Sequence, residues 1–84
     1  KVIHTPGHSS GGVCYVIKNV VFSGDTLFLS SYGRYDFEDS SFNDLKNSII
    51  VKLFGLNGDY VVYPGHGDST TMDYEREGNM ILWS

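Results

Sequence analysis

Three short apolar runs in this chain each end at a glycine turn that is followed at once by a side chain able to bind a metal ion. The runs lead into Thr5-Pro6-Gly7-His8, Ser23-Gly24-Asp25 and Tyr63-Pro64-Gly65-His66. Proline fixes φ, and glycine permits backbone conformations closed to other residues, so such turns hold the next side chain in a defined direction. Three strand ends that carry His, Asp and His therefore predict one shared rim and a metal site.

Length, composition and charge predict one small globular domain. The chain has 84 residues, of which 40% are hydrophobic and 19% charged, a profile unlike that of a disordered chain or a coiled coil. Its net charge is −4, and its six Lys and Arg residues are scattered, whereas a nucleic-acid-binding protein concentrates positive charge on one face. No apolar stretch approaches the roughly 20 residues that cross a bilayer. We expect a cytoplasmic protein without nucleic-acid or membrane partners.

Hydrophobic periodicity and turn signals predict a mixed α/β (α+β) fold. A helix is expected from Ser41, because Asp44 follows three residues later as in a capping box, and apolar residues then recur every three or four positions. Cys14 has no partner for an internal disulfide and is expected to be buried in a strand. We expect strands at 1–4, 13–17, 20–23 and 60–63, an irregular turn at 27–29, a loop at 30–39, helices at 41–54 and 70–77, and poorly defined residues at 80–83.

The glycine-turn motifs resemble those of the metallo-β-lactamase superfamily, nearest its glyoxalase II-like (hydroxyacylglutathione hydrolase-like) branch. His4–Ser9 resembles the third metal motif of that family, Ser23–Phe28 the fourth and Tyr63–Gly67 the fifth. The candidate ligands are separated by 17 residues (8 to 25) and by 41 (25 to 66). Gly33–Asp36 and Ser69–Glu75 match flanking segments of the branch. The resemblance therefore extends across nearly the whole chain.

This resemblance implies that residues 1–84 form a single partial domain. The domain would be the C-terminal half of an αββα metallo-β-lactamase sandwich, a mixed sheet with helices on one face. The first ligand cluster of the family, His-x-His-x-Asp-His, lies upstream in relatives and is absent from this sequence. We therefore expect two half-built metal sites, and we expect these 84 residues alone to be inactive as a hydrolase.

The resemblance also implies the roles of three residues. His8 would bind the first metal, Asp25 would bridge two metals, and His66 would bind the second. His4 matches the motif but is not a ligand in the family. The resemblance implies a two-zinc site, although imidazole and carboxylate ligands also suit Fe²⁺ and Mn²⁺. Water activated by the metals would attack a small-molecule thioester or related ester, with no further catalytic side chain.

Arg34 and Tyr35 are candidate substrate-binding residues. Arg34 occupies a position where relatives carry a basic residue that holds substrate or loop, and an ion pair with Asp36 is an alternative of equal weight. Tyr35, like Tyr32, would line a substrate cleft or simply lie exposed on the loop. Asp68 stands two residues after His66, where glutathione-using members carry an aromatic residue. The acyl substrate therefore stays open.

Two other functions are compatible with these residues. A persulfide dioxygenase-like enzyme would use one Fe²⁺ held by His8, Asp25 and an upstream histidine, and iron instead of zinc would favour it. A non-catalytic module would instead associate with a second copy, as a homodimer through an exposed sheet edge or apolar face. A monodisperse monomer at high concentration would argue against this second alternative.

Overall fold

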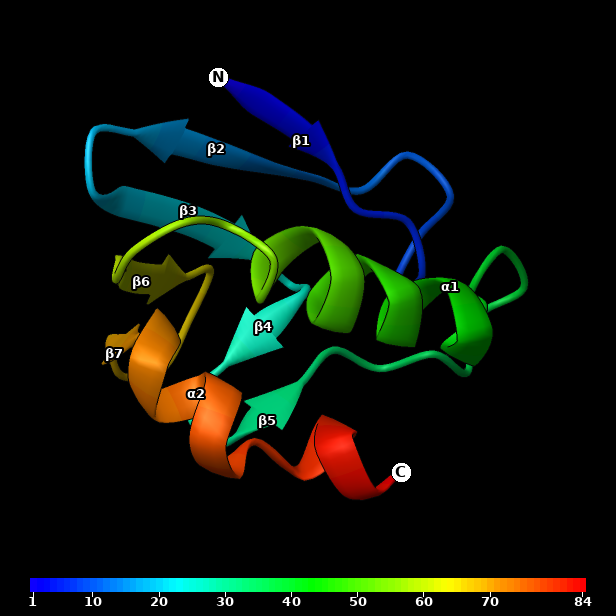
Figure 1. Ribbon diagram of the computed structural model, residues 1–84. Coiled ribbons are helices and arrows are strands. Elements are labelled where there is room, and N and C mark those ends of the chain that lie inside the picture. The colour runs from blue at the N-terminus through cyan, green and yellow to red at the C-terminus, as the bar shows by residue number, and fades with distance from the viewer.

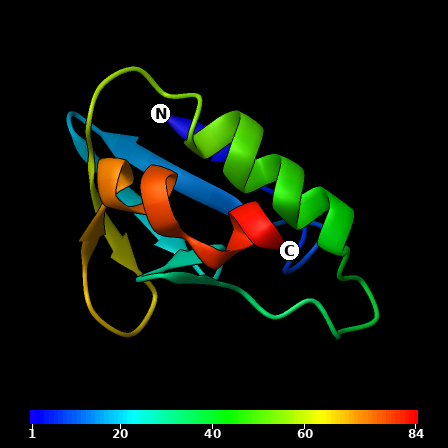
Figure 2. The ribbon, with the colours of Figure 1, turned by 60° about the horizontal axis from the view of Figure 1, so that its bottom comes forward.

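The computed structural model describes all residues 1–84 and shows a mixed sheet covered on one face by helices (Figure 1, Figure 2). The strand order is β1-β2-β3-β6-β7, with β3 and β6 parallel and the other neighbours antiparallel. The predicted mixed α+β architecture is confirmed. The strands of this sheet are β1 (Val2–His4), β2 (Val13–Ile17), β3 (Val20–Gly24), β6 (Val61–Pro64) and β7 (Thr70–Thr71).

The other elements lie over or beside this sheet. The N-terminal and C-terminal ends of the chain belong to different elements. They are a two-stranded sheet of β4 (Leu27–Phe28) and β5 (Ser31–Tyr32), the α-helices α1 (Phe42–Asn47) and α2 (Met72–Gly78), the π-helical segment η1 (Ser48–Leu53) and the 3₁₀ segment η2 (Met80–Trp83). None of these helices has the length and apolar character needed to cross a lipid bilayer.

The core lies between the helices and the sheet face that they cover. Strand residues Cys14, Val21 and Val62 are fully buried there. Burial raises the pKa of the Cys14 thiol, so this cysteine is a packing residue with little thiolate character. The helical segments contribute Leu45, Ile49, Leu53, Met72 and Ile81 to the same cluster.

The opposite face of the sheet carries a row of exposed apolar side chains. Val2 pairs with Tyr15, Tyr15 with Phe22, and Phe22 with Tyr63. All four are exposed, and the rings of Phe22 and Tyr63 stack with their centroids 5.9 Å apart. Because side chains alternate between the faces of a strand, this row is the counterpart of the buried row on the helical side.

The predicted first helix forms, but its second half is wider than an α-helix. Ser41 is the N-cap as expected, and its Oγ accepts a hydrogen bond from the Asp44 N–H at 3.2 Å. The buried residues Leu45, Ile49 and Leu53 are spaced by four, a period that drifts around an α-helix of 3.6 residues per turn. The wider turn of η1 returns Leu53 to the core.

Other predicted element boundaries differ from the structure, mainly where the chain forms short strands. Residues 27–29 were expected to be an irregular turn, but Leu27 and Phe28 pair with Tyr32 and Ser31 as β4 and β5. The second helix begins at Met72 instead of Thr70, because Thr70 pairs with Val62 in β7. The last apolar residues, expected to be poorly defined, form η2, which buries Ile81.

Candidate metal centre

His8 follows a loop whose backbone is held by the helix packed against it. Gly7 has φ +145°, and a β-carbon there would overlap the backbone of Leu45, so only glycine fits. Four carbonyl groups between His4 and His8 also accept hydrogen bonds from the helix or from the two residues before it. From the helix, Lys52 Nζ donates to His4 O at 2.7 Å and Ser48 Oγ to Pro6 O at 2.7 Å. Before the helix, Ser41 N donates to Gly7 O at 2.8 Å and Ser40 Oγ to His8 O at 2.6 Å.

Asp25 is directed by an irregularity at the end of β3. The register between β3 and β6 shifts between Phe22 and Gly24, and Gly24 has φ +52°, a left-handed conformation that favours glycine. A turn follows, in which the Thr26 N–H donates to the Ser23 carbonyl at 2.9 Å. The bulge and turn together move Asp25 out of the strand and toward the His8 loop, as bulges near functional sites commonly do.

His66 follows β6 after the Pro64-Gly65 turn and is far less enclosed. The Gly65 N–H donates to the Gly24 carbonyl at 2.8 Å, which ties this turn to the Asp25 turn. The His66 ring lies against Phe28, with ring centroids 4.8 Å apart. Gly67, the next residue, has φ +85° and open space around it. The side chain of His66 is 77% exposed, compared with 25% for His8.

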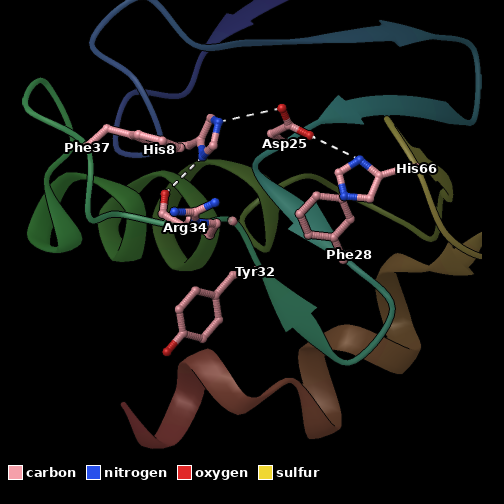
Figure 3. A pocket seen from close by; sticks show the side chains of 8 residues that line it. His8, Asp25, Phe28, Tyr32, Arg34, Phe37 and His66 are labelled. Atoms are coloured by element: carbon pink, nitrogen blue, oxygen red, sulfur yellow. Dashed lines mark hydrogen bonds and ion pairs between the residues drawn. The ribbon is translucent and has the colours of Figure 1, made fainter.

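The structure brings His8, Asp25 and His66 together at one rim (Figure 3). Nε2 of His8 lies 3.5 Å from Asp25 Oδ2, and Nδ1 of His66 lies 3.5 Å from Asp25 Oδ1. Two ligands on one tetrahedral zinc ion, each bonded at about 2.0–2.2 Å, stand about 3.4 Å apart. Both separations match that spacing, and the use of opposite carboxylate oxygens suits a bridge between two ions.

The His8 ring is fixed in the tautomer that a metal ligand needs. Its Nδ1 lies 2.9 Å from the carbonyl oxygen of Arg34. A carbonyl can only accept, so Nδ1 carries a hydrogen and Nε2 is the ring nitrogen turned toward Asp25. Metal-binding histidines usually donate their second ring nitrogen to a carbonyl or carboxylate in this way. His4 is different, because its Nε2 donates to the Ser10 carbonyl at 3.0 Å and it does not line the cavity over the three candidate ligands.

The donor set is suited to a transition metal but is incomplete for catalytic zinc. Asp25 stands between the two imidazoles, and nowhere in residues 1–84 do three His, Cys, Asp or Glu side chains converge on one point. Each ion would therefore receive two ligands from this chain, whereas catalytic zinc sites use three protein ligands.

A cavity of about 470 Å³ opens over the three candidate ligands. Arg34 lies at its rim, where the guanidinium is 4.8 Å from the centre of the Phe37 ring and pairs with Asp36 at 3.0 Å. The hydrogen bond from Arg34 holds the pKa of the Asp36 carboxyl below its ordinary value. Beyond the ligands, the wall consists of Phe28, Tyr32, Gly33, Arg34 and Phe37.

The two tyrosines singled out in the sequence lie differently. Tyr35 is outside this cavity, in a shallow hollow beside Arg34 and Asp36, with its ring 4.9 Å from that of Phe42. Tyr32 lines the cavity, but its hydroxyl is turned away from the ligands (Figure 3) and lies 2.9 Å from Ser84 Oγ.

Sequence reasoning missed the residues that hold the ligands in place. Phe28 reads as an ordinary core residue in the sequence, yet it contacts His66. Ser48 and Lys52 are four residues apart on the helix and both donate to the His8 loop. That spacing, next to a buried stripe, is the one signal in the sequence that points to a polar contact with another segment.

Comparisons with known proteins agree with this geometry. The chain is 48% identical to a probable metallo-hydrolase of Streptococcus pyogenes over 80 residues, which are 93% of this chain and 34% of that protein. It is 38% identical to hydroxyacylglutathione hydrolase GloC of Haemophilus influenzae, over 98% of this chain and 40% of that protein. The chain thus spans about two-fifths or less of the length of these relatives.

Solved structures superpose closely on this fold. The BLEG-1 B3 metallo-beta-lactamase matches with a TM-score of 0.92 and 41% identity, over all of this chain and 41% of that one. ETHE1 from Myxococcus xanthus gives 0.89 and 34%, over 94% of this chain and 37% of that one. TTHA1623 in a di-iron-bound form matches with a TM-score of 0.87 and 41% identity, over 94% of this chain and 40% of that one. Residues 1–66 match the metallo-beta-lactamase superfamily, and the chain belongs to that superfamily.

Proposed function

We propose that this chain serves in a metal-dependent hydrolase of thioesters or related esters, of the glyoxalase II type. The observation that carries the proposal is the placement of Asp25 between His8 Nε2 and His66 Nδ1, at 3.5 Å from each. The likeness to the hydroxyacylglutathione hydrolase of Haemophilus influenzae supports the thioester class. Zinc is the proposed metal, because two imidazoles and a carboxylate are ligands that it accepts.

When bound, two such ions supply an activated water and polarise the substrate carbonyl. The chain's own residues prepare the site for that chemistry. Arg34 O accepts the Nδ1 hydrogen of His8 and keeps the opposite nitrogen free, Asp25 offers one oxygen to each side, and Phe28 backs His66. The Arg34 guanidinium at the rim is the proposed anchor for a negative group of the substrate, with Tyr35 beside it.

Because each ion has two ligands here, we propose that the remaining ligands come from outside residues 1–84. The relatives matched above are more than twice as long as this chain. The isolated 84 residues would then bind zinc weakly and turn over no thioester. Measurable thioesterase activity of these residues alone, lost in His8→Ala, would contradict this part of the proposal.

The test of the function itself uses the full-length protein that contains this sequence. Its metal content would be measured by mass spectrometry, and its turnover followed with a glutathione thioester and a simple aryl ester. Asp25→Asn should lower thioester turnover by more than about 100-fold, since even residues that only support metal ligands cost 10–100-fold. Asp44→Asn, which changes an exposed acid of α1 outside the cavity lining, is the control. Turnover that survives Asp25→Asn would reject the metal mechanism.

A second candidate is a mononuclear iron enzyme of the persulfide dioxygenase type. It is favoured by the superposition on ETHE1, with a TM-score of 0.89. The di-iron-bound form of TTHA1623 supports iron as a metal for such a fold, but with two ions instead of one. His8 and Asp25 would then be ligands, and His66 would not. One iron per chain, oxygen consumption with a persulfide, and full activity in His66→Ala would together support it over the hydrolase.

A further inference from the structure

Glu75 on helix α2 is a fully buried acidic side chain that is not among the residues lining the metal centre. Its carboxylate accepts hydrogen bonds from the Ser30 N–H at 3.0 and 3.2 Å, from Thr70 Oγ1 at 2.6 Å and from Asn79 Nδ2 at 2.7 Å. No ion pair of the chain includes it. Burying a carboxylate is costly unless hydrogen bonds compensate, so the contacts of this group show what it is there to hold.

The contacts of Glu75 converge on the turn between β4 and β5. Ser30, at this turn, has φ +59°, a left-handed conformation that residues with a β-carbon rarely adopt. Glu75 accepts its N–H, and Asn79, which Glu75 also holds, donates to the Ser31 carbonyl at 2.9 Å. Two buried side chains, Glu75 on α2 and Asn79 just after the helix, thus hydrogen-bond to this turn.

The β4–β5 hairpin and the two residues that follow it contact all three candidate ligands. Phe28 on β4 packs against the His66 ring at 4.8 Å. Gly33, just past β5, runs so close to the Asp25 backbone that a β-carbon would overlap the Asp25 carbonyl. The carbonyl of Arg34, the next residue, accepts the His8 Nδ1 hydrogen at 2.9 Å. Figure 3 shows Phe28 beside His66 and Arg34 beside His8.

We propose that Glu75 is a positioning residue for the metal ligands. By fixing the strained turn at Ser30, it sets the place of Phe28 and of the Arg34 carbonyl, and through them the orientation of His66 and His8. The proposal concerns the same site as the proposed hydrolase and rests on it for its functional meaning. A residue that acts only on stability would leave the orientation of the His8 ring unchanged.

The experiment compares Glu75→Gln with Glu77→Gln in the 84-residue chain. Both substitutions remove one negative charge from α2, but Glu77 is exposed. Nitrogen NMR of the histidine rings, without metal, reports the tautomer of His8. We expect a single Nδ1–H form in the parent and in Glu77→Gln, and a mixture of tautomers in Glu75→Gln. Competition with a chelator for Zn²⁺ should show affinity lowered by about 10–100-fold in Glu75→Gln alone.

Further variants cover the case in which Glu75→Gln fails to fold. Thr70→Val removes one donor to the carboxylate at nearly constant shape and should shift the His8 tautomer in the same direction by less. If Glu75→Gln does fold, adding Ser30→Gly should restore the single tautomer, because glycine adopts positive φ freely.

Two results would overturn the proposal. One is a Glu75→Gln chain that has a reduced melting temperature but keeps the His8 tautomer of the parent. If Glu75→Gln is unfolded, the same result in Thr70→Val would count instead. The other is a double variant, Glu75→Gln with Ser30→Gly, that still shows mixed tautomers of His8. If the parent 84-residue chain shows no measurable Zn²⁺ binding, which two ligands per ion would explain, the comparison of tautomers still decides the role of Glu75. The Asp25→Asn test in the full-length protein decides the proposed hydrolase separately.

Discussion

The two histidines of the candidate centre are equally far from Asp25 but are held in different ways. His8 is largely enclosed, its Nδ1 is hydrogen-bonded to the Arg34 carbonyl, and its loop accepts hydrogen bonds from Ser48 and Lys52 of the helix. His66 is mostly exposed, has no hydrogen bond to its ring, and is followed by a glycine with open space around it. One side of the site is therefore preorganised and the other is adjustable.

This difference indicates where each side obtains its order. The His8 side is ordered by this chain alone, through a helix that is distant in sequence. The His66 side has only the Phe28 ring and the Gly65–Gly24 hydrogen bond to define it. We expect metal or substrate to supply the remaining order at His66, because an exposed side chain without hydrogen-bond partners samples several rotamers.

The largest expected contrast between the two sides comes from their glycines. Gly7→Ala places a β-carbon into the Leu45 backbone, and we expect it to lower the free energy of unfolding by more than about 4 kcal/mol or to prevent folding. Gly67→Ala meets open space at φ +85° and should cost about 1–2 kcal/mol. Thermal and urea unfolding monitored by circular dichroism would measure both. Equal losses would mean that the His8 loop is no more constrained than the His66 loop.

A smaller contrast is expected from the polar contacts of the two loops. Ser48 is buried, and its hydroxyl donates to the Pro6 carbonyl at 2.7 Å. Ser48→Ala leaves that carbonyl unpaired and should cost about 1–3 kcal/mol. Asp68→Ala on the exposed His66 side should stay within about 0.5 kcal/mol of the parent. Urea unfolding curves with unchanged slopes would give both values, and a neutral Ser48→Ala would remove the helix as the support of the His8 loop.

Each histidine ring of the candidate centre contacts one phenylalanine ring. Removing these contacts should change the mobility of the two histidine rings more than it changes the stability of the chain. Phe28→Leu removes the ring packed against His66 at 4.8 Å, an interaction worth about 0.5–1.5 kcal/mol. We expect the His66 ring to become more mobile in NMR relaxation measurements. Phe37→Leu removes the edge contact with His8 at 5.4 Å, but His8 should stay ordered because its hydrogen bond to Arg34 O remains. Increased His8 mobility in Phe37→Leu would contradict the comparison.

The smallest effect is expected at the exposed Arg34–Asp36 pair on the rim. The hydrogen bond from Arg34 lowers the pKa of the Asp36 carboxyl from 3.8. A group whose pKa is lower in the folded state than in the unfolded state stabilises the fold at pH values above its unfolded-state pKa. That stabilisation is lost as the pH falls through the folded-state pKa. The pair should therefore weaken only below pH 3.8. In Arg34→Gln, NMR titration should return the Asp36 pKa toward its ordinary value; an unchanged value would show that the pair is not formed in solution.

Much of this architecture could be predicted from the sequence because it depends on local signals. The N-cap at Ser41, the strand at Val13–Ile17 and the glycine turns before His8, Asp25 and His66 are each encoded within a few residues. The proximity of the three side chains was expected from the shared rim of neighbouring strands, and β3 and β6 are indeed adjacent.

What the sequence did not predict depends on contacts between distant segments. The hydrogen bonds from Ser48 and Lys52 to the His8 loop join residues 42 and 48 positions apart. The short strands β4 and β5 form around a serine with positive φ, which turn statistics would assign to glycine or asparagine. Buried carboxylates such as Glu75 are recognisable only once their donors are assembled. Local patterns therefore located the candidate ligands, and tertiary packing determined the contacts that support them.

The wide turn of η1 also bears on how the length of this chain can change. Each residue added to or removed from a helix rotates everything beyond it by about 100°. Val51 is exposed at the middle of η1, so replacing its side chain should cost little. Deleting it would let the segment relax to an α-helix in which Leu53 lies three positions after Ile49 and seven after Leu45, and these intervals keep all three residues on one helix face. This position therefore tolerates substitution, and a single-residue deletion here should keep Leu53 in the core.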